Sequence, residues 1–130
     1  MRWDKQRWPN FSVSELKCKH SGKCEMDETF LDRLQALRDL VGPLKVTSGY
    51  RDASHPIEAF KGRPGSHAMG RAVDISVEHG GHAWQVVDHA LQLGFTGIGL
   101  SLTGDSKFVH LDDLVSFHAH RPCLWTYASP

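Results

Sequence analysis

Residues 65–75 read Gly-Ser-His-Ala-Met-Gly-Arg-Ala-Val-Asp-Ile, and this stretch decides the fold. It places His67 at the end of a glycine-rich loop that leads into a predicted strand. Alternation along that strand puts Asp74 on the face opposite Val73 and Ile75. Burying an unpaired carboxylate among apolar residues costs on the order of several kcal/mol. Asp74 is therefore expected to have a cation or a metal ion as its partner.

A second histidine stands in a later predicted strand, where Val109 and Leu111 flank His110. If the two strands are neighbours in the sheet, His67, Asp74 and His110 converge. Two imidazoles and one carboxylate, with a fourth position left open, are a ligand set of catalytic zinc ions. An Asp–His hydrogen-bonded pair without a metal fits the same pattern, and these residues alone leave both alternatives open.

Periodicity and turn residues predict the remaining elements of the chain. Ser12 or Ser14 is placed to begin a short helical turn. Helices are expected over residues 28–41 and 81–93, with strands over residues 44–48, 70–76, 96–102 and, as the last strand, 107–112. Residues 49–69 form a long connection, of a length that is usually functional or mobile. The order predicts an α+β fold with a small, mostly antiparallel sheet and flanking helices, in which residues 1–10 form an N-terminal arm and residues 11–130 a single domain.

The composition excludes several classes of protein. The 130 residues hold 15 basic and 15 acidic side chains, and this balance gives no electrostatic case for nucleic-acid binding. No stretch approaches the roughly 18 apolar residues of a membrane span, and the N-terminus lacks the apolar core of a signal peptide. Three cysteines cannot all pair within one chain. Cys18 and Cys24 are expected to form a local disulfide or to pack a turn, and Cys123 to be buried.

Two residues of the long connection are candidates for contact with a substrate. Arg51 ends the run Val-Thr-Ser-Gly-Tyr-Arg, directly after a predicted strand. A guanidinium there can bind a carboxylate or a developing oxyanion through two hydrogen bonds, although a surface salt bridge is the alternative. His55 lies in the same connection and is the second candidate.

Three motifs together closely resemble the M15 zinc peptidases. They are Val-Thr-Ser-Gly-Tyr-Arg at residues 46–51, the stretch at residues 65–75, and Phe-Val-His-Leu-Asp at residues 108–112. That family includes D-Ala-D-Ala carboxypeptidases and phage endolysin peptidases, which cut peptidoglycan stem peptides, and the hedgehog signalling domain shares its zinc fold. The similarity extends over residues 11–127.

The resemblance implies a hedgehog-like, DD-peptidase-like zinc fold and a role for particular residues. By this resemblance His67, Asp74 and His110 are the zinc ligands. Arg51 would hold the substrate or its tetrahedral intermediate, and Ser66 would contact the peptide.

The sequence departs from the family pattern at the general base. Many members have Glu or Asp three residues before the last zinc-binding histidine, where this chain has Lys107. A charged lysine cannot accept a proton. We expect Asp105, in the preceding turn, to act as the base, with Asp112 as the alternative. Asp112 lies two residues beyond His110 and could equally orient an imidazole.

The expected function is that of a zinc-dependent peptidase acting on peptidoglycan stem peptides, as a D,D-carboxypeptidase or an endopeptidase in cell-wall lysis or remodelling. The alternative is a zinc-stabilised, non-catalytic module that binds cell-wall peptide, or a structural module of a phage. We expect a monomer with no nucleic-acid partner and no membrane insertion. A phage or prophage protein that acts on the cell wall, passing from host cytoplasm to periplasm, fits the absence of a signal peptide. A bacterial envelope protein exported by another route fits it as well.

Overall fold

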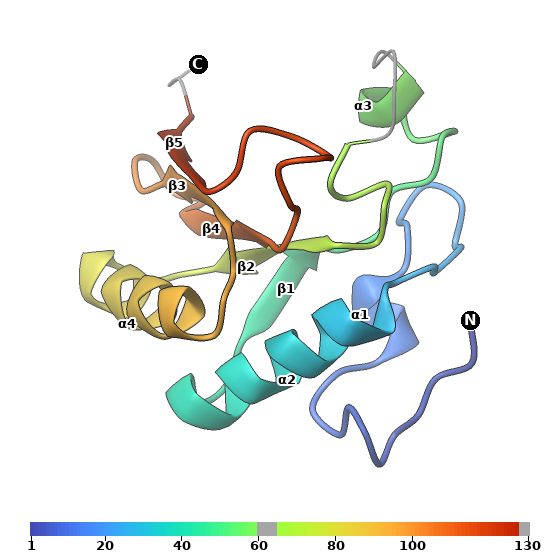
Figure 1. Ribbon diagram of the computed structural model, residues 1–130, viewed down its shortest axis with the longest axis horizontal. Coiled ribbons are helices and arrows are strands. Elements are labelled where there is room, and N and C mark those ends of the chain that lie inside the picture. The colour runs from blue at the N-terminus through green and yellow to red at the C-terminus, as the bar shows by residue number, and fades with distance from the viewer. Residues whose placement is uncertain (60–64, 128–130) are drawn as a thin grey trace.

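The computed structural model describes residues 1–59 and 65–127 of the chain, and Figure 1 shows their arrangement. The helices are α1 (Val13–Leu16), α2 (Glu28–Val41), α3 (Pro56–Ala59) and α4 (Gly80–Gln92). The strands are β1 (Lys45–Ser48), β2 (Ala72–Ser76), β3 (Gly97–Ser101), β4 (Phe108–Asp112) and β5 (Cys123–Thr126). The expected α+β class is confirmed, and each predicted helix and strand is present within a few residues of its expected bounds.

The strands form one sheet in the order β1-β2-β4-β3-β5. All neighbouring pairs are antiparallel except β3 and β5, which run parallel. The prediction that residues 107–112 form the last strand is wrong, because β5 follows and adds to the outer edge of β3. The sequence signal for this strand is weak, because it is four residues long and half exposed. A parallel pair also lacks the short hairpin turn by which an antiparallel pair can be recognised in a sequence.

Helices α2 and α4 cover one face of the sheet (Figure 1). Helix α2 begins after Asp27, whose side chain accepts a hydrogen bond from the Phe30 backbone N–H at 2.8 Å, and ends at Gly42, where φ is +89°. Its buried side chains pack against Val73 and Ile75 of the sheet in one continuous core. The apolar side of β2 therefore faces the helices, which leaves Asp74 on the opposite side.

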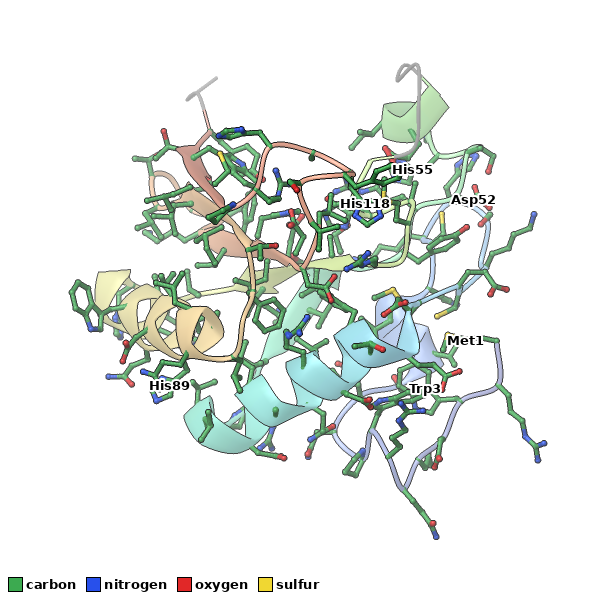
Figure 2. The ribbon with its side chains drawn as sticks, viewed as in Figure 1. Met1, Trp3, Asp52, His55, His89 and His118 are labelled. Carbon is green, nitrogen blue, oxygen red and sulfur yellow. The ribbon has the colours of Figure 1, made fainter. Side chains whose placement is uncertain are left out.

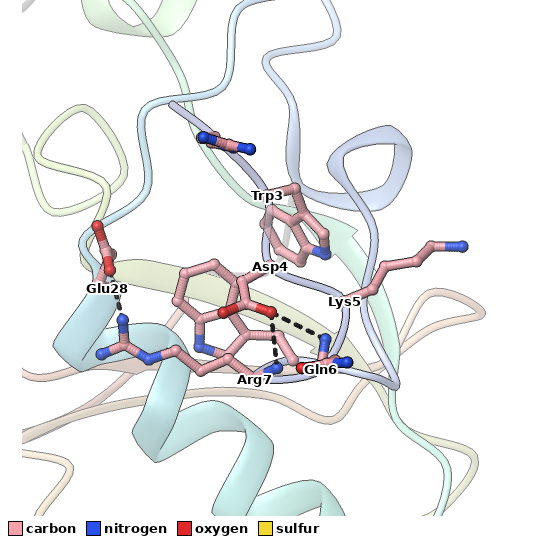
Figure 3. A pocket seen from close by; sticks show the side chains of 8 residues that line it. Trp3, Asp4, Lys5, Gln6, Arg7 and Glu28 are labelled. Carbon is pink, nitrogen blue, oxygen red and sulfur yellow. Dashed lines mark hydrogen bonds and ion pairs between the residues drawn. The ribbon is translucent and has the colours of Figure 1, made fainter.

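The N-terminal segment packs against α2 (Figure 3). Trp8 is fully buried, and its indole N–H donates a hydrogen bond to Asp32 at 2.9 Å. Arg7 forms ion pairs with Asp32 and Glu28. Trp8, with Trp3 packed against the core beside it, thereby attaches this segment to the domain, because a tryptophan buries a large apolar area.

The cysteines are free thiols. Cys18 and Cys24 are buried in a turn, so of the two alternatives the packed turn is confirmed and the local disulfide is not. Cys123 is partly exposed, and the expectation that it is buried is wrong because it lies on the edge strand β5. Among the described residues no helix is long and apolar enough to cross a membrane.

Candidate metal centre

The centre is built on one row of residues that crosses the sheet. Asp74 on β2 is paired with His110 on β4, His110 with Gly99 on β3, and Gly99 with Trp125 on β5. Residues directly opposite one another project to the same face of a sheet. Neighbouring strands therefore place Asp74 and His110 side by side, on the face away from the helices.

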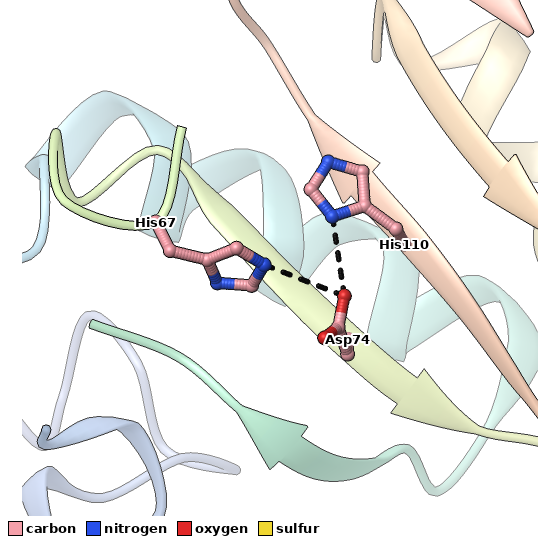
Figure 4. A group of neighbouring side chains, drawn as sticks. All are labelled: His67, Asp74 and His110. Atoms are coloured by element: carbon pink, nitrogen blue, oxygen red, sulfur yellow. Dashed lines mark hydrogen bonds and ion pairs between the residues drawn. The ribbon is translucent and has the colours of Figure 1, made fainter. Parts of the chain in front are cut away.

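His67 reaches the same point from the turn before β2, as Figure 4 shows. Its Nε2 atom lies 3.4 Å from Asp74 Oδ1, and His110 Nδ1 lies 3.1 Å from the same oxygen. One ligand atom from each of the three side chains falls within 4.8 Å of the others. The convergence expected from the sequence is present in the structure.

A backbone carbonyl decides which nitrogen of His67 is free. His67 Nδ1 lies 2.8 Å from the carbonyl oxygen of Gly49. Since a carbonyl only accepts, Nδ1 carries the proton, and the lone pair of Nε2 points at Asp74. Gly49 is closely packed, because a Cβ there would lie 2.7 Å from the carbonyl oxygen of Leu16. The position therefore requires glycine, and the carbonyl that orients His67 is fixed in place.

A carboxylate decides which nitrogen of His110 faces Asp74. Asp112 is fully buried, and its Oδ2 atom accepts a hydrogen bond from His110 Nε2 at 2.8 Å. Arg121 donates to both oxygens of Asp112, from Nε at 2.9 Å and from Nη2 at 2.7 Å. Gly97 leaves the room for this carboxylate, since a Cβ on Gly97 would lie 2.3 Å from either oxygen. His110 is thus held with Nδ1 facing Asp74.

The electrostatics of the cluster follow from burial and from these contacts. Burial lowers the pKa of His67 and keeps its imidazole neutral. Burial would also lower the pKa of His110, but the hydrogen bonds to Asp112 and Asp74 outweigh it and raise the pKa. The pKa of Asp112 falls to about 2, because its hydrogen bonds with His110 and Arg121 outweigh the effect of burial. The pKa of Asp74 lies well below its ordinary range, since its contacts with both imidazoles outweigh burial.

These donors fit a metal ion better than a proton. A proton on His110 Nδ1 satisfies one contact with Asp74, but the lone pair of His67 Nε2 still faces the same carboxylate oxygen. One cation between the three atoms satisfies all of them at once. Two imidazole nitrogens and one carboxylate oxygen are a donor set of catalytic zinc sites. The hydrogen bonds from the other ring nitrogens to Gly49 and Asp112 are the kind that orient metal-binding histidines.

The three side chains open onto a pocket of about 370 Å³. It is lined by Arg51, Ile57, Ser66, His67, Asp74, Phe108, His110, Trp125 and Tyr127. Arg51 Nη2 lies 3.6 Å from Asp74 Oδ2, and the arginine side chain is mostly buried. The structure therefore brings Arg51 and Ser66 to the cluster, and the surface salt bridge considered for Arg51 is not what it forms.

The two candidate bases lie elsewhere. Asp105 is exposed on the turn between β3 and β4, outside the pocket lining. Asp112 is buried behind His110, and both of its oxygens are already engaged. Lys107 donates its Nζ proton to the carbonyl of Gly104. No structural finding tests which group accepts a proton, so the assignment of the base stays a prediction.

His55 does not line the pocket either. Its Nδ1 accepts a hydrogen bond from the Ile57 backbone N–H at 3.1 Å, and its ring lies 6.1 Å from that of His20. Figure 2 shows His55 and Asp52 on the connection that leads to α3. Ile57, two residues further on, contributes to the pocket instead. The substrate contact expected for His55 has no support in this geometry and stays a prediction.

Sequence reasoning missed the aromatic wall of the pocket. Trp125 lies over Gly99, where a Cβ would come within 2.6 Å of the indole nitrogen, and its ring centroid is 5.2 Å from that of His110. Tyr127 contacts the ring of Phe108 at 5.1 Å between centroids. The two glycines spaced at residues 97 and 99 were the available signal, because glycine in a strand often marks the close approach of another group.

The fold and the cluster define a candidate metallopeptidase, and comparison with protein families supports this class. The model of the Peptidase M15 family matches residues 9–112, which include His67, Asp74 and His110. The chain therefore belongs to the Peptidase M15 family, whose members are metallopeptidases. No curated protein matches the chain. The matched region ends with β4, so Arg121, Trp125 and Tyr127 lie beyond it.

Proposed function

We propose that this protein is a zinc-dependent peptidase that hydrolyses peptide bonds in peptidoglycan stem peptides. The observation that carries the proposal is the convergence of His67 Nε2, Asp74 Oδ1 and His110 Nδ1 at the base of a pocket, in a chain of the M15 family. Its site of action would be the bacterial cell wall, as for a lysis protein of a phage or prophage, and it would act as a monomer.

The ion that fits the donor set is zinc. His67, Asp74 and His110 would hold it, and the side of the cluster that faces the pocket would remain open. Zinc bound in this way supplies a Lewis acid and lowers the pKa of a coordinated water to roughly 7. The protein contributes the orientation of the ligands, through the carbonyl of Gly49 and the carboxylate of Asp112.

The pocket would bind the peptide through hydrogen-bond donors and aromatic surfaces. Arg51 is placed beside Asp74 and can donate to a carbonyl or carboxylate oxygen of the substrate. Ser66 lies next to the cluster and can contact the peptide backbone. Phe108 and Trp125 provide apolar walls for small side chains such as the methyl group of alanine.

A second candidate function is a zinc-stabilised module that binds cell-wall peptide without cutting it. The observation that favours it is the absence of a carboxylate from the pocket lining, among the described residues, other than Asp74 itself. Lys107 occupies the position where many family members have an acidic base. The module would bind zinc and peptide yet release no product.

Mass spectrometry of muropeptides after incubation with the purified zinc-loaded protein tests the proposal. Loss of a terminal alanine identifies a D,D-carboxypeptidase, and conversion of cross-linked dimers to monomers identifies an endopeptidase. The variant His67→Ala should abolish either activity together with bound zinc, whereas His89→Ala on α4, outside the pocket lining, should change neither. Unchanged muropeptides that still bind the wild-type protein would support the binding module and contradict the peptidase.

A further inference from the structure

The pocket receives side chains from both edges of the sheet. Arg51 follows β1, the strand at one edge, and Tyr127 follows β5, the strand at the other edge. The metal ligands Asp74 and His110 lie on β2 and β4, two of the three strands between these edges. All four residues line the same pocket. A peptide bound over the cluster therefore has a guanidinium on one side and a phenol on the other.

The hydroxyl of Tyr127 lies beside the indole nitrogen of Trp125. A Cβ on Gly99 would lie 2.6 Å from Trp125 Nε1 and 2.9 Å from Tyr127 Oη, so both atoms lie above the same glycine. Trp125 Nε1 can therefore donate a hydrogen bond to the phenol oxygen, because an indole nitrogen is a donor only. An indole donor on that oxygen leaves the phenol's own proton available for another acceptor. Among residues 1–59 and 65–127 no acceptor is bonded to that proton.

The polar groups of the pocket, apart from the three ligands, are able to donate. They are the guanidinium of Arg51, the hydroxyl of Ser66 and the hydroxyl of Tyr127. A set of donors gathered around one pocket is suited to an oxygen that becomes negatively charged during a reaction. In amide hydrolysis that oxygen is the carbonyl oxygen of the scissile bond.

We propose that Tyr127 is a catalytic residue that donates a hydrogen bond to the carbonyl oxygen of the scissile peptide bond, from the side opposite Arg51. The inference rests on the proposed peptidase function. When water adds to the carbonyl carbon, the π pair of the C=O bond moves onto the oxygen, and the hydrogen bond strengthens without transfer of the phenol proton. The pair returns as the C–N bond breaks, and the amine leaves with a proton that came from the water.

The surroundings of Tyr127 suit a group that keeps its proton. Burial raises the pKa of Tyr127, and the negative charge of Asp74 adds to this effect. The phenol therefore stays neutral at the pH values where a peptidase works. Trp125 acts as a positioning residue, because its N–H lies beside the phenol oxygen and can donate to it, and its ring packs against His110.

The decisive experiment compares two tyrosine variants, since the chain has only two tyrosines. Tyr127→Phe removes the hydroxyl and keeps the ring against Phe108, and Tyr50→Phe makes the same change outside the pocket lining. Steady-state kinetics would use the muropeptide that the wild-type protein cleaves. For Tyr127→Phe we expect kcat to fall roughly 100- to 1000-fold, the cost of losing one oxyanion donor, with little change in KM and full zinc content. Tyr50→Phe should match the wild type.

A binding measurement gives a readout that does not depend on turnover. Calorimetry would compare a phosphinate analogue of D-Ala-D-Ala, whose tetrahedral oxygens imitate the addition intermediate, with the unmodified dipeptide. Tyr127→Phe should weaken the phosphinate by at least tenfold and leave the dipeptide unchanged. Trp125→Phe, which removes the N–H and keeps an aromatic ring, should shift kcat and phosphinate affinity in the same direction by a smaller factor.

The outcomes separate this inference from the function on which it rests. A wild-type protein that cleaves no muropeptide contradicts the peptidase function itself. An active wild-type protein with Tyr127→Phe within twofold of its kcat contradicts only the role of Tyr127. Loss of zinc or a lowered melting temperature in Tyr127→Phe would show that the hydroxyl has a structural role. The kcat of Trp125→Phe would then decide, and an unchanged value would overturn the proposal.

Discussion

Single hydrogen bonds select the ligand atoms of the candidate metal centre. The carbonyl of Gly49 fixes the proton on His67 Nδ1, and the carboxylate of Asp112 fixes the proton on His110 Nε2. One histidine is thereby presented through Nε2 and the other through Nδ1. Neither choice follows from the sequence motif, because a motif gives the residue type and not the ring orientation.

Asp112 and Asp105 are expected to differ sharply when each is changed to asparagine. Asp112→Asn removes the charge that holds His110 and leaves Arg121 without its partner. Loss of such an orienting group weakens metal affinity roughly 10- to 100-fold, and added zinc should restore part of the activity. Zinc titration against a chelator, followed by activity with excess zinc, measures both effects.

Asp105→Asn is the companion variant and decides the question of the base. The sequence favours Asp105 as base, which would make this variant about 100- to 10,000-fold slower with zinc still bound. Its exposed position outside the pocket leads us to expect near wild-type turnover instead. A large loss of kcat with full zinc content would return the base role to Asp105.

Arg51→Lys is expected to retain zinc and stability while losing most peptidase activity. The guanidinium lies beside Asp74 and presents several N–H donors in one plane, whereas an ammonium group presents a single point of charge. The loss should be roughly 100- to 1000-fold in kcat if Arg51 stabilises the developing oxyanion. Muropeptide turnover, metal content and a melting curve on the same preparation provide the test. Turnover close to the wild type would limit Arg51 to its ion pair with Asp74.

At the level of elements, strand β3 supports the centre because two of its residues are glycines, which leave space for side chains from the neighbouring strands. Gly97 makes room for the Asp112 carboxylate and Gly99 for the Trp125 indole. The strand thus separates β4 from β5 while allowing groups from both to meet above it. Strand β5 adds in parallel to β3 and carries the aromatic wall.

Gly97→Ala is expected to disturb the metal centre from a distance. The new methyl group would lie 2.3 Å from both oxygens of Asp112, and overpacking of this kind costs about 1–3 kcal/mol of stability. Displacing Asp112 should also release His110 and lower the affinity for zinc. Denaturant unfolding and zinc titration measure the two effects.

Gly80→Ala is the matched control for that variant. Gly80 begins α4, and a Cβ there meets nothing within 4 Å. It should leave zinc affinity unchanged and raise the free energy of unfolding by about 0.4–1 kcal/mol, the usual gain from reduced freedom of the unfolded chain. Equal loss of zinc in both variants would contradict the role assigned to Gly97.

The predictability of the elements depended on how local their signals are. Helix α2 was predicted with its observed bounds, because Asp27, the apolar stripe and Gly42 lie within the same short stretch. Strand β5 was missed because its partner, β3, is distant in sequence. The residues of the site were likewise predicted only in part. His67, Asp74 and His110 converge as predicted, whereas the aromatic wall depends on the parallel pairing of β5.

For the whole molecule, metal binding should depend on pH through a single proton. The pKa of His110 is raised above its ordinary value of 6.5, and that of His67 is lowered. Zinc must displace the proton on His110 Nδ1. Its affinity should therefore begin to weaken on acidification while the pH is still above 6.5, and should then decrease roughly tenfold for each further unit by which the pH is lowered. Competition with a chelator at several pH values measures this slope.

The metal-free protein should respond to pH in the opposite sense. A group whose pKa is raised by folding stabilises the fold below its unfolded pKa, and this contribution is lost as the pH rises through the folded pKa. His110 should therefore stabilise the metal-free protein in mild acid and the zinc-bound protein at neutral pH and above. As the pH rises, the free energy of unfolding should therefore decrease without zinc and increase with zinc. Parallel pH profiles would contradict the assignment of His110 as a ligand.

The position of β5 after β4 in the chain has a consequence for the order in which the protein is made. A ribosome releases the ligands His67, Asp74 and His110 first, and the residues that complete their surroundings, Arg121 and Trp125, only afterwards. Until residues 121–127 are synthesised, Asp112 lacks its arginine and the pocket lacks a wall. A nascent chain would therefore carry the ligands of a peptidase before it could bind a peptide, and a complete pocket would form only once β5 had been made.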